Sequence, residues 1–163
     1  MSIEIFRIDD RLIHGQVVVG WGQPLGITFI VLVDDSVAQS EWERDLYRMG
    51  APPGMEVSFV TVDEAVEALP GWVAEERKGL LLTGDIETMR RLTVRSALVR
   101  AVNLGGIHHS VGRIQHLRYV FLTPGEEAVL TAMAAAGVTI SAQDVPATRP
   151  VPLVQVLAGC DLT

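Results

Sequence analysis

The chain has 163 residues, of which 48% are hydrophobic and 20% charged, and its formal net charge is −7. This composition is typical of a globular domain and excludes a disordered or collagen-like chain. The negative net charge argues against nucleic-acid binding, because a phosphate backbone is bound by a basic surface. The length suits one domain, and we expect a single domain over residues 1–163.

Signals for export, membrane insertion or metal binding are not found. The start MSIEIFRIDD has neither a basic region nor a long apolar one, so we expect no secretory signal. The longest apolar runs, such as Ile27–Val33, are too short to span a bilayer. The single cysteine, Cys160, cannot form an internal disulfide, and no Cys/His spacing is typical of a zinc site. We therefore expect a cytoplasmic protein with no metal and no other cofactor.

Apolar runs of strand length alternate with stretches of helical period. The expected strands are Ile3–Ile8, Ile27–Val33, Met55–Val60, Gly79–Leu82, Ala97–Leu104, Leu117–Leu122 and Val138–Gln143. This β-α alternation predicts an α/β fold: a three-layer, open, mostly parallel twisted sheet of six or seven strands, with helices on both faces. No helical segment precedes Leu117–Leu122, so we expect one strand there to run antiparallel.

Four helices are expected, and three of them have recognisable ends. Ser36–Met49 stops at a glycine, whereas Thr83–Arg95 is a further helical stretch without clear caps. The other two begin with capping-box patterns, in which a threonine is followed three residues later by a glutamate. These patterns start at Thr61 and at Thr123, and the second helix is expected to end at Gly137.

The loop after the first expected strand carries an unusual set of polar side chains. It reads Asp-Asp-Arg-Leu-Ile-His-Gly over residues 9–15, at the carboxyl end of a strand, where ligands sit in open α/β sheets. His14 and Gly15 lie where the next helix should begin. Gly15 has no side chain that could cover its backbone amide. A helix N-terminus presents unpaired N–H groups to an anion. The segment therefore predicts an anion cradle beside an imidazole.

An imidazole in that position can bind an anion, act as a general base or become phosphorylated. Arg11 could hold a phosphoryl group with a charge-assisted fork. Asp9 and Asp10 would repel such a dianion, so we expect them to turn away and to bond loop amides or Arg11. On the residues alone, a structural histidine with two turn-forming aspartates explains the segment equally well.

Several segments of the chain resemble one known family. Residues 7–21, RIDDRLIHGQVVVGW, are similar to the signature around the active histidine of the enzyme IIB component of the bacterial phosphoenolpyruvate-dependent sugar phosphotransferase system (PTS), in its mannose/fructose/sorbose class. The similarity continues through FIVLVDD at 29–35, APPG at 51–54, VNLGGIHH at 102–109, GVTISAQDVP at 137–146 and the following PVPL. It therefore covers nearly the whole chain.

The resemblance implies roles for individual residues. His14 would carry the phosphoryl group through Nδ1, Arg11 would steady that group, and Asp10 would orient the loop. The residues expected to bind the phosphoryl oxygens are Asp9, Leu12, Ile13 and Gly15, through the loop backbone, and Thr83, through its hydroxyl.

The resemblance also implies partners. A phosphohistidine on a IIA protein or domain would donate to His14, and His14 would donate to a sugar held by the IIC and IID membrane subunits, at the inner face of the membrane. A regulatory binding module that transfers no sugar, and a flavodoxin-like module for a phosphorylated cofactor, remain as alternatives. For His108 and His109 a solvent-facing loop is the favoured interpretation, and contact with the site or with a partner is the alternative.

Overall fold

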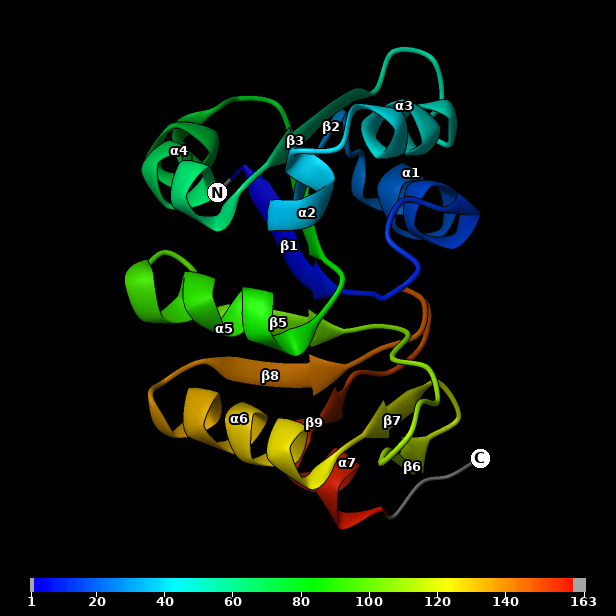
Figure 1. The fold of residues 1–163 in the computed structure, drawn as a ribbon, viewed down its shortest axis with the longest axis vertical. Helices are drawn as coiled ribbons and strands as arrows, with labels where there is room; N and C mark the ends of the chain where they lie inside the picture. The colour runs from blue at the N-terminus through cyan, green and yellow to red at the C-terminus, as the bar shows by residue number, and fades with distance from the viewer. Residues whose placement is uncertain (1, 160–163) are drawn as a thin grey trace.

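A computed structural model describes residues 2–159, and its seven-stranded main sheet has the order β3-β2-β4-β1-β5-β8-β9 (Figure 1). Its strands are β1 (Ile3–Ile8), β2 (Phe29–Val33), β3 (Glu56–Val60), β4 (Gly79–Thr83), β5 (Ala101–Leu104), β8 (Thr139–Ala142) and β9 (Val151–Pro152). Every neighbouring pair is parallel except β8 with β9. The expected α/β fold class is thereby confirmed.

The expected single strand Leu117–Leu122 is wrong. The polar pair Arg118 and Tyr119 interrupts the apolar run and forms a turn between β6 (Ile114–Leu117) and β7 (Val120–Leu122). These two strands make a separate antiparallel hairpin outside the main sheet. The antiparallel strand of the main sheet is instead the two-residue β9, which is too short for a periodic pattern to reveal it.

Side chains cap the N-termini of four of the eight helices in residues 2–159. The helices are η1 (Gln16–Gly22, a π-helix), α1 (Gln23–Leu25), α2 (Asp35–Ala38), α3 (Glu41–Met49), α4 (Val62–Ala74), α5 (Ile86–Arg95), α6 (Pro124–Ala135) and α7 (Leu153–Ala158). Both predicted capping boxes, at Thr61 and Thr123, are present. The stretch expected as one helix over Ser36–Met49 is two helices, α2 and α3. The stretch expected over Thr83–Arg95 starts only at α5, because Asp85 caps that helix and Thr83 ends β4.

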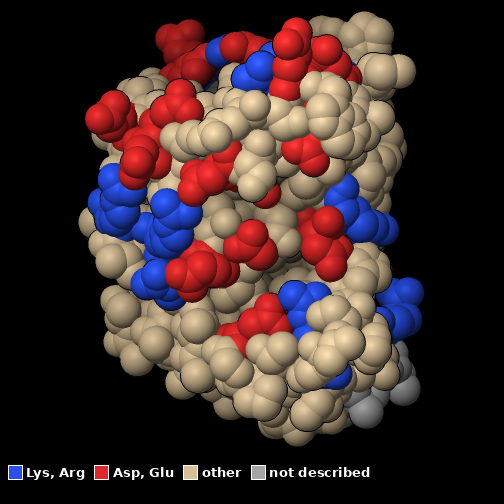
Figure 2. Space-filling view, in the orientation of Figure 1, with Lys and Arg blue, Asp and Glu red and all other residues tan. Residues whose placement is uncertain are grey.

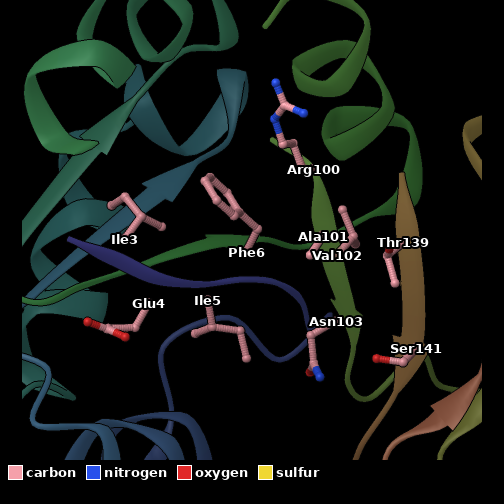
Figure 3. A pocket seen from close by; sticks show the side chains of 10 residues that line it. All are labelled: Ile3, Glu4, Ile5, Phe6, Arg100, Ala101, Val102, Asn103, Thr139 and Ser141. Atoms are coloured by element: carbon pink, nitrogen blue, oxygen red, sulfur yellow. The ribbon is translucent and has the colours of Figure 1, made fainter. Parts of the chain in front are cut away.

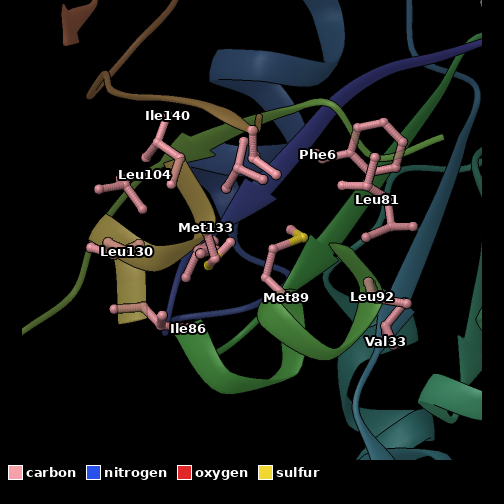
Figure 4. Close-up of a cluster of buried hydrophobic side chains, with 14 of the residues drawn as sticks. Phe6, Val33, Leu81, Ile86, Met89, Leu92, Leu104, Leu130, Met133 and Ile140 are labelled. Atoms are coloured by element: carbon pink, nitrogen blue, oxygen red, sulfur yellow. The ribbon is translucent and has the colours of Figure 1, made fainter. Parts of the chain in front are cut away.

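Two hydrophobic clusters lie on opposite faces of the sheet, because alternate strand residues point to opposite sides. On one face α4, α5, α6, α7 and the hairpin pack against residues such as Phe6, Leu81 and Leu104 (Figure 4). On the other face η1 packs through Val17, Val18 and Trp21 against β2 and β4. The helix that follows the Asp9–Gly15 loop is therefore anchored by its buried face.

The second face of β5 and β8 is less completely covered. Ala101, Asn103, Thr139 and Ser141 alternate with core residues, and they border a hollow of about 310 Å³ (Figure 3). The hollow lies along the strands and not at the loop of His14. No helix within residues 2–159 has both the length and the apolar character needed to cross a membrane.

Candidate functional site

The sheet places the Asp9–Gly15 loop between the ends of two strands. Ile8, the last residue of β1, is level with Thr83 of β4 on one side and Leu104 of β5 on the other. The next amides continue this pairing: Asp9 donates to the carbonyl of Thr83, and Asp10 to that of Gly106, both at 2.9 Å. The loop therefore starts in the crevice at the carboxyl edge of the sheet, as predicted from its position after a first strand.

A strained residue turns the loop. Leu12 has φ 61°, which makes it the one non-glycine residue with positive φ among residues 2–159. Its amide donates to the carbonyl of Asp9 at 3.0 Å, and its buried side chain lies against Gly84, where a β-carbon would come within 2.7 Å of Leu12 Cδ2. A left-handed leucine costs about 1–2 kcal/mol, and burial of its side chain helps to hold it there.

Asp9 is the buried centre of the loop. Its Oδ1 accepts from the Arg11 amide at 3.1 Å and from Arg11 Nε at 3.4 Å, and its Oδ2 faces Arg7 Nη2 at 3.5 Å. The same Oδ1 lies 3.4 Å from His14 Nε2. Burial opposes ionisation of Asp9, but the contact with His14, the hydrogen bond from the Arg11 amide and the Arg7 charge outweigh it and lower the pKa to about 2. Asp9 is therefore a permanent carboxylate at neutral pH.

The two ring nitrogens of His14 have different surroundings. Nε2 is enclosed and faces Asp9, whereas Nδ1 accepts from the Gln16 amide at 3.2 Å. Because Asp9 is an anion, these neighbours assign the proton to Nε2 and leave a lone pair on Nδ1. The side chain of His14 is 19% exposed, so the ring reaches solvent at the edge of the fold.

Unpaired amides and a guanidinium surround this ring. The amides of Ile13, His14 and Gly15 have no acceptor within residues 2–159, and a β-carbon on Gly15 would meet nothing within 4 Å. Arg11 is 39% exposed, and its Nη2 donates to Gln16 Oε1 at 2.9 Å. The loop therefore combines open space, free donors and a positive charge, which are the requirements for an anion.

Asp10 bonds a second histidine instead of His14. Its Oδ1 lies 2.5 Å from His108 Nδ1, and its Oδ2 accepts from the His108 amide at 2.7 Å. The ring of His108 is exposed, as the favoured interpretation had it, and it also bonds the site loop, which was the alternative. His109 instead packs its ring edge-on against Phe121 at 5.8 Å.

Thr83 contacts the loop through its backbone. Its carbonyl accepts from the Asp9 amide, but its buried hydroxyl donates to the carbonyl of Asp85 at 3.1 Å. The structure thus brings His14, Arg11, Asp9 and Asp10 together, and it directs the Thr83 hydroxyl elsewhere. A role for that hydroxyl in phosphoryl binding stays a prediction.

A buried arginine beneath the loop was not anticipated from the sequence. Arg7 is fully buried, donates to Asn103 Oδ1 and to the Gln143 carbonyl, and lies 4.5 Å from the centre of the Trp21 ring. Gly105 leaves room for it, since a β-carbon there would lie 2.4 Å from Arg7 Nη2. The signal was a lone charge in the otherwise apolar second half of β1.

Gln16 was also missed. Its side-chain amide joins Arg11 to Asp144, because Gln16 Nε2 donates to Asp144 Oδ1 at 2.9 Å while its Oε1 accepts from Arg11. Asp144 in turn accepts from Arg118 at 2.7 Å. A chain of bonds therefore runs from the cradle to the loop after β8.

Charges elsewhere on the surface are largely distributed in pairs. Figure 2 shows acidic side chains over the upper part and the middle of one face, and basic side chains in groups at its two sides, with smaller groups at the top and in the lower half. On α5, Arg90 pairs with Glu87 and Arg91 pairs with Asp35. Residues 2–159 contain no group of three or more His, Cys, Asp and Glu side chains that could hold a metal ion.

Sequence comparisons relate the chain to sugar-specific transport components. The family model described as PTS system sorbose subfamily IIB component matches residues 3–161. The N-acetylgalactosamine-specific phosphotransferase enzyme IIB component 1 of Escherichia coli K12 is 32% identical over 146 residues, which are 89% of this chain and 92% of that protein. The PTS system mannose-specific EIIAB component of the same organism is 35% identical over 117 residues, which are 71% of this chain and 36% of that protein.

A solved structure agrees with these matches. The crystal structure of the IIBSor domain of the sorbose permease from Klebsiella pneumoniae superposes with a TM-score of 0.87, at 27% identity and with 98% of each chain covered. The similarity thus extends over the sheet, its helices and the loop that carries His14. The chain belongs to the sorbose subfamily of PTS IIB components, in the mannose/fructose/sorbose class.

Proposed function

We propose that this protein is a phosphocarrier in which His14 Nδ1 accepts a phosphoryl group from a IIA phosphohistidine and donates it to a sugar held by IIC and IID membrane subunits. One observation carries the proposal: ionised Asp9 faces His14 Nε2, which leaves the Nδ1 lone pair beside the Gln16 amide. Family membership supports the reaction class, because the relatives are named as phosphotransferase components.

The transfer follows from this arrangement. The Nδ1 lone pair attacks phosphorus in line while the P–N bond to the donor histidine breaks, and the donor ring keeps that electron pair. The proton on His14 Nε2 stays in place, where it faces Asp9. Arg11 and the loop amides stabilise the negative charge of the transferred group. Catalysis therefore comes from positioning and electrostatic stabilisation. In the second step the oxygen of a sugar hydroxyl forms a bond to phosphorus while the P–Nδ1 bond of His14 breaks. The Nδ1 keeps that electron pair, and the hydroxyl proton goes to a base of the membrane subunit that holds the sugar.

The proposed partners follow from the family. A related protein is named as an EIIAB component, which supports a IIA protein or domain as the donor to this chain. In this proposal residues 1–163 are a single cytoplasmic IIB domain that reaches the inner face of the membrane only through IIC and IID. The transferred sugar is held by those membrane subunits.

Mass spectrometry of the intact chain tests the proposal. Incubation with a phosphorylated IIA partner, at neutral to alkaline pH because phosphohistidine is acid-labile, should add one phosphoryl group. His14→Ala should abolish the addition, and His109→Ala should keep it, since His109 packs on Phe121 outside the cradle. Labelling of His14→Ala to the extent of the unaltered protein would overturn the assignment.

A further inference from the structure

His108 is held more firmly than its exposure suggests. Its side chain is 55% exposed, yet its ring and its amide both bond Asp10, and its carbonyl accepts from Arg113 Nη1 at 2.7 Å. Arg113 is itself held by a two-pronged contact with Glu126, at 3.0 and 2.9 Å. Three bonds thus fix the position and the rotation of this surface imidazole.

The ring lies at the rim of the cradle. A β-carbon built on Gly106 would have three side-chain atoms within 3.6 Å, namely His108 Cε1, Asp9 Oδ1 and Arg11 Nε. Asp9 Oδ1 is also the atom that faces His14 Nε2. Two imidazoles and one guanidinium therefore approach the same small region, and the absence of a side chain on Gly106 allows the approach.

The free edge of His108 has the chemistry of an anion donor. Nδ1 is bonded to Asp10, while Nε2, the neighbour of Cε1 in the ring, has no partner within residues 2–159. In the imidazolium form both nitrogens donate, and Nε2–H is then free to bond an oxygen. The charged groups near His108 are Asp10, which bonds its Nδ1, and Arg113, which bonds its carbonyl. Asp9 and Arg11 share with its ring the neighbourhood of Gly106.

We propose that His108 contacts the phosphoryl group in transit, with the imidazolium Nε2–H donating to a phosphoryl oxygen as the group moves onto or off His14. The inference rests on the proposed function of His14. In this proposal the two adjacent aspartates have different roles. Asp9 orients the ring of His14, which is phosphorylated, and Asp10 orients the ring of His108, which with Arg11 stabilises the negative charge of the phosphoryl group. Only hydrogen bonds are made and broken at His108, which forms no covalent bond.

The other described histidines serve as controls for this interpretation. His109 is the neighbour of His108 in the chain, but its ring lies against Phe121. His116 is buried, with Nδ1 facing the Val156 carbonyl at 3.1 Å. His109→Ala is therefore the matched control, since it removes an exposed imidazole from the same loop without changing the rim of the cradle.

The test measures single-turnover transfer from a phosphorylated IIA partner to His108→Ala, His108→Arg, His109→Ala and unaltered protein. Loss of a hydrogen bond to a charged oxygen should slow the transfer step of His108→Ala by roughly 10- to 100-fold, with little change in the IIA concentration needed for half-maximal rate. His108→Arg keeps a cationic donor and should recover most of the rate. The ³¹P chemical shift of phosphorylated His14 should change in His108→Ala and stay unchanged in His109→Ala.

Three results would overturn the inference: an unchanged transfer rate in His108→Ala, a change confined to the half-saturating IIA concentration, or a failure of arginine to restore the rate. The second would make His108 a docking residue. Failure of the proposed function is distinguishable, because the unaltered protein would then not be phosphorylated on His14 at all. If the unaltered protein and His108→Ala are phosphorylated on His14 at equal rates, the inference alone fails.

Discussion

Two neighbouring aspartates in one loop hold two histidines in contrasting environments. The side chain of Asp9 is fully buried and faces His14, which is 19% exposed. The side chain of Asp10 is 25% exposed and bonds His108, which is 55% exposed. The difference arises because Asp9 lies directly at the end of β1, between the guanidinium groups of Arg7 and Arg11, whereas Asp10 lies in the turn that follows, nearer the surface. Interactions between charges weaken as solvent enters. The buried pair, Asp9 with His14, therefore fixes the tautomer of its imidazole more strongly than the exposed pair, Asp10 with His108.

Removing the charge of the buried pair should have the largest effect. Asp9→Asn keeps the shape but offers His14 Nε2 an amide that can donate as well as accept, so the proton can move to Nδ1 and block it. We expect phosphoryl transfer to fall on the order of 10²- to 10⁴-fold, as for other imidazoles that lose an orienting carboxylate. Single-turnover kinetics measure the loss, and ¹⁵N spectra of the His14 ring report the tautomer.

The exposed pair supplies the control for that substitution. Asp10→Asn removes a charge from the same loop and releases His108 without touching the partner of His14. It should slow transfer by roughly 10-fold at most, because a bond that is shared with solvent contributes less. Equal losses in Asp9→Asn and Asp10→Asn would show that the difference in burial between the two pairs has no functional consequence.

Arg7, which lies beneath Asp9 and His14, can be displaced by a substitution at Gly105, the residue after β5. In Gly105→Ala the new methyl group would lie 2.4 Å from Arg7 Nη2, and Arg7 is fully buried and bonded on several sides. We expect a loss of about 1–3 kcal/mol in the free energy of unfolding, measured by urea denaturation. Gly71→Ala is the control, since a β-carbon there meets nothing within 4 Å and α4 should gain up to about 1 kcal/mol. If Gly105→Ala is as stable as the unaltered protein, Arg7 is free to move.

Acid should weaken the buried pair. Folding lowers the pKa of Asp9 from 3.8 to about 2, so its charge stabilises the fold above about pH 4, and that contribution is lost as the pH falls toward 2. It amounts to about 2 kcal/mol. The difference in unfolding free energy between the unaltered protein and Asp9→Asn should therefore narrow between about pH 5 and pH 2. An equal narrowing for Asp45→Asn, an exposed carboxylate on α3, would point to net surface charge instead.

Local patterns in the sequence were enough to predict most of the fold and the position of the loop. Capping boxes at Thr61 and Thr123 and continuous apolar strands are signals read over a few residues, and the structure contains them. The hairpin and β9 were not predictable in this way. Strands of two to four residues lack a period, and their pairing depends on contacts with distant segments.

The same limit applies to the site. His14 and Arg11 lie in one short segment, so their proximity follows from the chain itself. Arg7 meets Asn103 across 96 residues, and Asp10 meets His108 across 98, so only the register of β1 with β5 brings these partners together. The inward turn of the Thr83 hydroxyl has a similar cause, because the cap of α5 at Asp85 provides its acceptor.

The smallest expected effect concerns the outer support of the exposed pair. Arg113→Lys keeps the positive charge but removes the planar guanidinium, which donates to both carboxylate oxygens of Glu126 and to the His108 carbonyl. The free energy of unfolding should fall by less than about 1 kcal/mol, and transfer should slow about 2- to 3-fold, while hydrogen exchange at the His108 amide becomes faster. Arg48→Lys, whose pair with Asp45 is exposed on α3, should change neither the transfer rate nor the exchange at His108. Arg113→Lys could instead lose as much transfer as His108→Ala while hydrogen exchange at the His108 amide stays unchanged. That result would mean that Arg113 itself contacts the phosphoryl group, and that the rigidity of the His108 loop does not contribute to transfer.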